Sequence, residues 1–291
     1  MSADLHCHTK LSDGSLGIDD LIVLAKKQGI NTISITDHNC QAGNIRGELI
    51  GKRHDVKVIP GVELSSTDTE TGEEVDILCY LADSPARLEG LCRRNMMACK
   101  KASQFMIIGT AKKYNVTPDL IVKCATGATN IYICHIMRAL IESGFTNEFY
   151  GDVYKELFSK ESPASVFFKA KYDDTKDVID AIHESGGIAV LAHAGKYSDG
   201  FVERMISYGL DGLEVWCPEN TEEQSEKLLK KAKQNKILAL GGTNFRGMYN
   251  ETPLTVGSYI TPDKQLDELM SYKAKQKRLR KKAEQEAKKD D

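Results

Sequence analysis

Histidines and carboxylates stand where several short apolar segments of the sequence end. His6 and His8 close the first segment, and a spacing of two residues directs both imidazoles to one side of a strand, where they can bind one metal ion. Taken alone, a histidine is more often a core or loop residue than a ligand. Here four of the seven histidines share this kind of position. The residues at these ends are His6, His8, Asp37, His38, Glu63 and His193, and Asp76 lies within a further apolar stretch.

This set of side chains predicts a metal site with more than one ion. Imidazole and carboxylate donors together suit Zn, Mn or Fe, and Glu63 could bridge two ions as a shared carboxylate. A structural barrel would have little physical reason to gather so many desolvated polar groups. We therefore expect these residues to meet in one place.

The elements that must position them alternate between strand-like and helical patterns. "ADLHCHT", "TISITDH" and "VKVIPGVEL" come near the N-terminus, and "IAVLAH", "GLEVW" and "ILALGG" near the C-terminus. This alternation predicts parallel strands joined by helical crossovers, in six or seven units of an incomplete or distorted barrel. Helical patterns lie at about Ile18 to Gln28, Ile45 to Ile50, Phe201 to Tyr208 and Glu222 to Gln234.

A helical stretch interrupts this alternation from about residue 84 to residue 171. We expect a barrel formed by residues 1–83 and 172–270, with residues 84–171 inserted as a small helical cap that shapes the substrate mouth. Thirteen of residues 271–291 are charged, which is more than half of the segment. They are typical of a solvated, frayed helix or a disordered tail, and the acidic residues at their end weaken the alternative of an RNA or membrane contact.

Composition excludes several classes of function. The chain has 291 residues, 41% of them hydrophobic, and a formal net charge of −3, so it lacks the global basic field that drives non-specific nucleic-acid binding. Its eight cysteines form no Cys-x-x-Cys pair, which is typical of reduced thiols in a cytoplasmic protein. No leader and no membrane span is indicated. We expect no membrane association and no obligate protein partner.

Two other enzyme classes also fail on their motifs. A nucleophile elbow of the Gly-x-Ser-x-Gly type does not occur. Neither a P-loop nor a Gly-x-Gly-x-x-Gly fingerprint follows a strand-like segment, so ATP and dinucleotide cofactors are not indicated.

Five segments, in this order and spacing, resemble the PHP (polymerase and histidinol phosphatase) superfamily of metal-dependent phosphoesterases. They are "DLHCHTKLSDGSL", "ITDHN", "IPGVELS", "VDILCYL" and "VLAHAGKY". The subgroup that the chain resembles most includes nucleotide phosphatases and 5′-to-3′ exoribonucleases of the RNase AM (TrpH-like) type, and "CHIMRALIESGF" is similar to its insertion. The resemblance implies a distorted (β/α)7 barrel with a helical cap.

The resemblance also implies up to three divalent ions that cradle a phosphate, with a metal-activated hydroxide that attacks phosphorus. It assigns the first ion to His6, His8, Glu63 and the last-motif position Asn244, the second to Glu63, Asp76 and His193, and the third to Asp13 and His38.

The chain departs from the family pattern at these last positions. Asp76 stands where a histidine is usual, which keeps a ligand but favours Mn, Fe or Mg over Zn. "GGTNFRGM" carries Asn244 and Arg246 where the family has Asp and His. Asparagine offers only a neutral oxygen, and the guanidinium of Arg246 has no lone pair to give. We therefore expect two ions, and at most three.

Two functions remain open from the sequence. In the first, the chain hydrolyses a phosphomonoester or terminal phosphodiester of a nucleotide or short oligonucleotide, with Asp13 and His38 as catalytic residues and Arg246 as a phosphate clamp. In the second, it is a degenerate pseudoenzyme that binds a phosphate ligand or nucleic acid. Asn244 could also be an engineered substitution. By similarity to the subgroup, Lys196, Arg138 and His135 are further candidates for substrate contact.

Overall fold

Seven strands of the computed structural model, which describes residues 2–287 and side chains as far as residue 278, form one sheet in sequence order. The sheet nearly closes on itself after the last strand, because His8 N donates to Phe245 O at 2.8 Å and Phe245 N donates to His6 O at 3.2 Å. The predicted distorted barrel is thus confirmed. The strands are β1 (Ala3–Cys7), β2 (Thr32–Ile35), β3 (Lys57–Thr67), β4 (Glu74–Tyr80), β5 (Ile188–Leu191), β6 (Gly212–Trp216) and β7 (Leu238–Gly241).

Helices cover the outside of the barrel where the helical patterns predicted them. α1 buries Leu21, Ile22 and Ala25 at helical spacing against the sheet. α9 begins with a capping box in which Thr221 and Gln224 satisfy each other's backbone N–H groups. The barrel helices are α1 (Ile18–Lys27), α2 (Gly43–His54), α7 (Thr175–Glu184), α8 (Asp199–Ser207) and α9 (Glu222–Asn235).

β4 corrects the prediction of an all-parallel sheet, because it runs antiparallel to both β3 and β5. Only residues 68–73 connect β3 to β4, and Gly72 N donates to Asp68 O at 2.7 Å within this turn. A parallel crossover needs a dozen or more residues, so this connection can only form a hairpin. The pairing sets Asp76 opposite Ser65, two residues along β3 from Glu63 and on the same face of the sheet.

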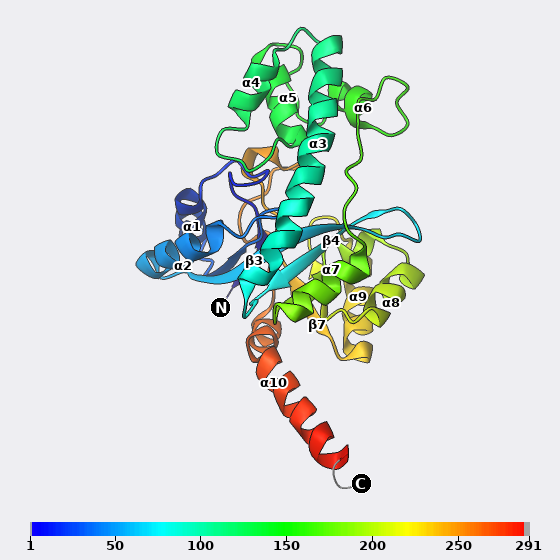
Figure 1. Cartoon of the computed structure of the whole chain (residues 1–291). Helices are drawn as coiled ribbons and strands as arrows, with labels where there is room; N and C mark the ends of the chain where they lie inside the picture. Colours follow the sequence, from blue (N-terminus) through cyan, green and yellow to red (C-terminus); the bar gives the residue numbers. More distant parts are fainter. Residues whose placement is uncertain (1, 288–291) are drawn as a thin grey trace.

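Four helices form a cap above one end of the barrel (Figure 1). They pack around an apolar cluster of their own that includes Met106 and Leu140. The long helix α3 joins the two parts, since its Leu91 belongs to the barrel core and its Met106 to the cap core. The boundaries of the insertion at residues 84 and 171 stay a prediction. The cap helices are α3 (Glu89–Lys113), α4 (Pro118–Cys124), α5 (Ile133–Glu142) and α6 (Asp152–Phe158).

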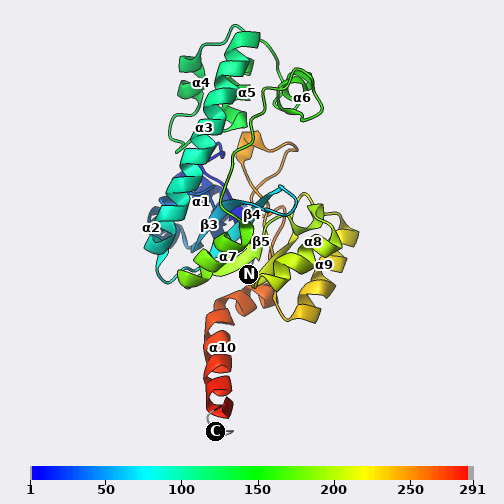
Figure 2. The same ribbon diagram turned by 45° about the vertical axis from the view of Figure 1, so that its right-hand side comes forward.

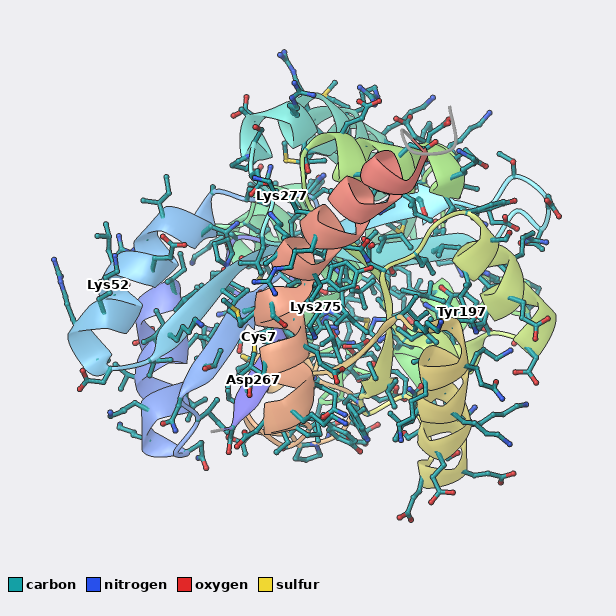
Figure 3. The ribbon with its side chains drawn as sticks, turned by 90° about the horizontal axis from the view of Figure 1, so that it is seen from below. Cys7, Lys52, Tyr197, Asp267, Lys275 and Lys277 are labelled. Atoms are coloured by element: carbon teal, nitrogen blue, oxygen red, sulfur yellow. The ribbon has the colours of Figure 1, made fainter. Side chains whose placement is uncertain are left out.

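The last helix, α10 (Asp263–Ala287), lies across the opposite end of the barrel (Figure 3) and then extends away from it (Figures 1 and 2). Its Leu266 and Leu269 are buried in the same apolar cluster as Leu5 of β1. The predicted charged tail is therefore helical as far as Ala287, and residues 288–291 lie outside the described part. Within residues 2–287, no helix combines the length and apolar character that a membrane crossing requires.

Candidate metal centre

Glu63 of β3 lies at the centre of four histidines that come from three other parts of the barrel. Its Oε2 is 3.3 Å from His6 Nε2, 3.2 Å from His8 Nε2 and 3.3 Å from His38 Nδ1. Its Oε1 is 3.4 Å from His193 Nε2. Both carboxylate oxygens are buried, and neither accepts a hydrogen bond from a described residue. The predicted gathering of these five residues is what the structure shows.

Glu214, which the sequence analysis missed, orients two of these histidines. Its Oε1 accepts a hydrogen bond from His6 Nδ1 at 2.8 Å, so the neutral His6 ring carries its lone pair on Nε2, toward Glu63. Its Oε2 accepts from the backbone N–H of His193 at 2.8 Å. The signal was present in the sequence as one glutamate inside the buried strand "GLEVW".

A second missed carboxylate, Glu219, lies behind His193. Its Oε2 is 3.3 Å from His193 Nδ1, and its Oε1 accepts from Asn244 Nδ2 at 2.7 Å. His193 and Asn244 both adopt left-handed backbone conformations, with φ of 49° each. Such conformations are uncommon outside glycine and concentrate at functional sites.

The close carboxylates hold protons on the histidines of the metal-free protein. Burial alone would lower the pKa of His38, but Glu63 and Asp13 raise it to about 9. Burial opposes a charged His193 as well, yet Glu219 and Glu63 raise its pKa to about 9. Glu214 and Glu63 likewise outweigh burial and raise the pKa of His6 well above its ordinary value. The cluster therefore has an excess of negative charge that bound protons offset.

The same donors fit divalent ions. His6, Glu63 and His193 form one group whose ligand atoms lie within 4.8 Å of one another, and His8, His38 and Glu63 form a second. A buried carboxylate without a hydrogen bond, faced by ring nitrogens, suits an ion that accepts from both groups. Each of these two groups could hold an ion, and they share Glu63.

Asp76 lies outside these two groups. Asp76 is half-buried and lines a cavity of about 220 Å³ together with His38 and Tyr132. As a ligand of the second ion, it stays a prediction. His193, Glu214 and Cys217 form a third group of ligand atoms. Glu214 in this group already accepts hydrogen bonds from His6 Nδ1 and from His193 N.

Arg246 is held among the residues that the sequence analysis assigned to a third ion. Its Nε donates to Asp13 Oδ2 at 2.6 Å, its Nη2 lies 3.3 Å from His38 Nε2, and its Nη1 donates to Asn244 Oδ1. Burial would raise the pKa of Asp13, but Arg246 and then His8 hold it well below its ordinary value. Asp13 is therefore an ion-paired carboxylate in the metal-free protein.

Asp37 has a structural part in this arrangement. Its carboxylate accepts from Thr9 N at 2.8 Å, from Thr9 Oγ1 at 2.7 Å and from Ser12 Oγ at 2.6 Å. These bonds fix the loop that follows β1. That loop carries Asp13, whose Oδ1 is 3.2 Å from His8 Nδ1.

A cleft of about 500 Å³ opens beside Arg246, between the cap and the barrel. Asp13, Glu219, Asn244 and Arg246 lie at its barrel side. Its other walls are rich in aromatic rings, and Tyr150 of the cap donates from its hydroxyl to Tyr249 O at 2.7 Å. The aromatic lining residues are Tyr132, Phe149, Tyr150, Tyr154 and Tyr249.

Three predicted substrate contacts do not line this cleft. Arg138 donates to Glu142 Oε1 at 2.9 Å and to the Tyr249 hydroxyl at 3.3 Å. His135 is buried, and its Nδ1 accepts from Tyr132 N at 3.1 Å. Lys196 Nζ lies 4.9 Å from the centre of the Tyr197 ring. Arg138 and His135 thus support wall residues of the cleft, whereas Lys196 contacts Tyr197, which does not line it. For all three, a contact with substrate stays a prediction.

Known proteins resemble the chain over most of its length. The sequence model of the PHP domain matches residues 4–280. A phosphoribosyl 1,2-cyclic phosphate 1,2-diphosphodiesterase of Eggerthella lenta is 27% identical over 260 residues, which cover 87% of this chain and 97% of the relative. A 5′-3′ exoribonuclease of Haemophilus influenzae is 28% identical over 249 residues, 83% of this chain and 89% of that one.

A solved structure shares the fold. A Bifidobacterium adolescentis protein, described as a metal-dependent phosphoesterase, superposes with a TM-score of 0.83 at 28% identity. The match covers 91% of this chain and 94% of that one. Barrel and cap are thus both part of the shared architecture.

Proposed function

The chain belongs to the PHP domain family, and we propose that it is a metal-dependent phosphoesterase that hydrolyses the terminal phosphate ester of a nucleotide or short oligonucleotide. The observation that carries this proposal is the buried Glu63 carboxylate, which faces four histidine rings and accepts no hydrogen bond from a described residue. A buried carboxylate is costly unless positive charge balances it, and the rings around Glu63 can supply that charge either as protonated histidines or as ligands of a bound cation.

Two ions would be held by His6, Glu63 and His193 and by His8, His38 and Glu63. The mixture of imidazole and carboxylate donors favours Mn, Fe or Zn. Bound there, divalent ions would activate a water molecule at neutral pH and neutralise the charge of the phosphate. Glu214 keeps the lone pair of His6 on the side of the site, and Asp37 keeps the loop of Asp13 in place.

The cleft supports a substrate that carries an aromatic base. A phosphate at the Arg246 end would place the rest of the molecule between rings of the cap and the barrel loop, such as Tyr150, Tyr154 and Tyr249. Stacking on aromatic side chains binds a base without regard to its sequence. Arg246 keeps one N–H of Nη2 beyond its contacts with described residues, and this group would reach the phosphate.

The test combines metal content with a substrate screen. We expect about two transition-metal ions per chain after expression in supplemented medium, and phosphate release from mononucleotides, 3′,5′-bisphosphates or 5′-phosphorylated oligoribonucleotides. Glu63→Gln keeps the shape but removes the shared charge, so it should lose both metal and activity, whereas Glu184→Gln on the surface should lose neither. A wild-type chain without metal would favour the alternative of a phosphate-binding pseudoenzyme.

The base-binding walls need a separate comparison. Tyr154→Ala should raise KM for a nucleoside 5′-monophosphate and leave KM for ribose 5-phosphate unchanged, because only the former carries a base. Tyr208→Ala, at a half-buried tyrosine outside the cleft whose hydroxyl contacts Glu70, is the matched control. Equal effects of Tyr154→Ala on both substrates would remove the base from the proposal.

A further inference from the structure

We propose that the guanidinium of Arg246 is a built-in cation that takes the place of a third metal ion at Asp13 and His38. The inference concerns the same centre as the proposed function and rests on it for the identity of the neighbouring ions. The contacts of Arg246 with Asp13, His38 and Asn244 support this inference, which limits the number of ions that the chain can hold.

The guanidinium of Arg246 already occupies the space beside the ligand atoms that a third ion would need. Asp13 Oδ2 accepts from Arg246 Nε at 2.6 Å, and His38 Nε2 lies 3.3 Å from Arg246 Nη2. Asn244 Oδ1, at the position where the family resemblance expects an aspartate, accepts from Arg246 Nη1. The three nitrogens of the guanidinium thus contact three ligand atoms of residues that the sequence analysis assigned to ions.

A third ion and this guanidinium exclude each other. Ligand oxygens and nitrogens lie about 2.0–2.2 Å from a transition-metal ion. An ion bound to Asp13 and His38 would therefore contact the guanidinium, whose nitrogens approach the same atoms at 2.6 and 3.3 Å. Two positive charges this close in a partly buried site repel strongly. Arg246 cannot resolve the conflict by losing its proton.

The charge balance explains why such a replacement can be tolerated. An Asp-x-His pair with one divalent ion carries −1 + 0 + 2 = +1. Asn244 and Arg246 carry 0 + 1 = +1 without an ion. The side chain of Arg246 is 18% exposed and that of Asp13 14%, so this charge sits at the edge of the cleft, where a phosphate can meet it. Unlike an ion, it cannot be removed by a chelator.

The experiment counts ions in a reversal variant. Metal-stripped protein is titrated with Mn²⁺, and bound metal is measured by calorimetry and elemental analysis. The double variant Asn244→Asp/Arg246→His should bind one more ion per chain than the wild type, because it frees Asp13 and His38 and adds two donors. Arg204→His makes the same change at an Arg–Asp ion pair remote from the site and should leave the count unchanged.

The outcomes separate this inference from the proposed function. A wild-type chain that binds no ion contradicts the proposed function, and the inference then still requires one ion in the double variant. Equal counts in the wild type and a folded double variant would overturn the inference. If the double variant fails to fold, anomalous scattering from Mn²⁺-soaked wild-type crystals decides: scattering between Asp13 and His38 overturns the inference, and its restriction to the Glu63 positions supports it.

Discussion

At the scale of residues, the candidate metal centre depends on two buried carboxylates, Glu63 and Glu214, that contact its histidines. The sequence placed Glu63 at a strand end, whereas it lies inside β3, which continues four residues past it to Thr67. Its place in the site could still be predicted, because it belongs to a recognisable motif. Glu214 lies within a buried strand, and only folding brings it 2.8 Å from His6 Nδ1, a residue 208 positions away. Contacts of this kind form only when the barrel closes, and local sequence patterns do not show which distant side chains then meet.

Glu214→Gln tests the positioning role of this residue. The amide keeps the size of the side chain but can present its NH2 to His6 Nδ1, which would move the lone pair away from Nε2. We expect metal affinity to fall by about 10- to 100-fold, with unchanged stoichiometry at saturating metal. Calorimetric titration measures this change, and Glu226→Gln on the exposed face of α9 is the control. Unchanged affinity in Glu214→Gln would assign Glu214 a packing role only.

The protons on the histidines predict how metal binding depends on pH. His38 and His193 have pKa values of about 9 in the metal-free protein, so each must release a proton to bind an ion. Apparent metal affinity should therefore rise with pH from 6.5 to 8.5. The raised pKa values stabilise the metal-free fold most below pH 6.5, and this contribution is lost as pH rises toward 9.

Rising pH thus lowers the stability of the metal-free protein and raises its affinity for metal, so one thermal measurement can test both effects. The increase in melting temperature that Mn²⁺ causes should be larger at pH 8.5 than at pH 6.5. At the higher pH the metal-free protein is less stable and binds the metal more tightly. An increase that shrinks with rising pH would show that the histidines do not carry the protons that metal displaces.

At the scale of elements, the alternating pattern predicted the barrel but not the direction of β4. Strand-like segments look alike in either direction, and the information lay in the length of the connection at residues 68–73. The hairpin has a consequence for the site. It places Asp76 and Glu63 on one face, so that Asp76 stays available as a further ligand near His38.

Gly242 shows how closely two elements approach at the site. A Cβ at this position would lie 2.3 Å from His6 N and 2.5 Å from His6 Cβ. We expect Gly242→Ala to reduce the free energy of unfolding by about 1–3 kcal/mol and to weaken metal binding, because β1 must shift with His6. Urea denaturation and metal titration measure both effects.

The matched control for this change is Gly200→Ala on α8, where an added Cβ meets no atom within 4 Å. Alanine in a helix should leave stability unchanged or raise it by up to about 1 kcal/mol. If Gly242→Ala behaved like this control, the closure of the barrel would tolerate more space between β7 and β1 than the structure indicates.

At the scale of the whole molecule, the candidate metal centre and the apolar contacts of α10 lie at opposite ends of the barrel. The cap lies above one end of the barrel, and α10 covers the other (Figures 1 and 3). The cleft and the candidate metal centre lie at the cap end, because residues of the cap line cavities together with Arg246 and with His38. Leu269 of α10 is fully buried beneath the strands, among residues such as Leu5 and Leu240. The amphipathic start of α10 could be read from the sequence only weakly, because the charged residues that follow dominate the pattern.

Leu269→Ala should therefore separate the two properties. Removing a buried leucine leaves a cavity and should reduce the free energy of unfolding by about 2–5 kcal/mol. Because α10 lies at the end of the barrel opposite the cap, the number of bound ions and KM should stay unchanged under conditions where the variant is folded. Met270→Ala, at the partly exposed neighbour, should cost much less stability. A loss of metal in folded Leu269→Ala would mean that α10 holds the strand ends in register, and that both ends of the barrel set the geometry of the site.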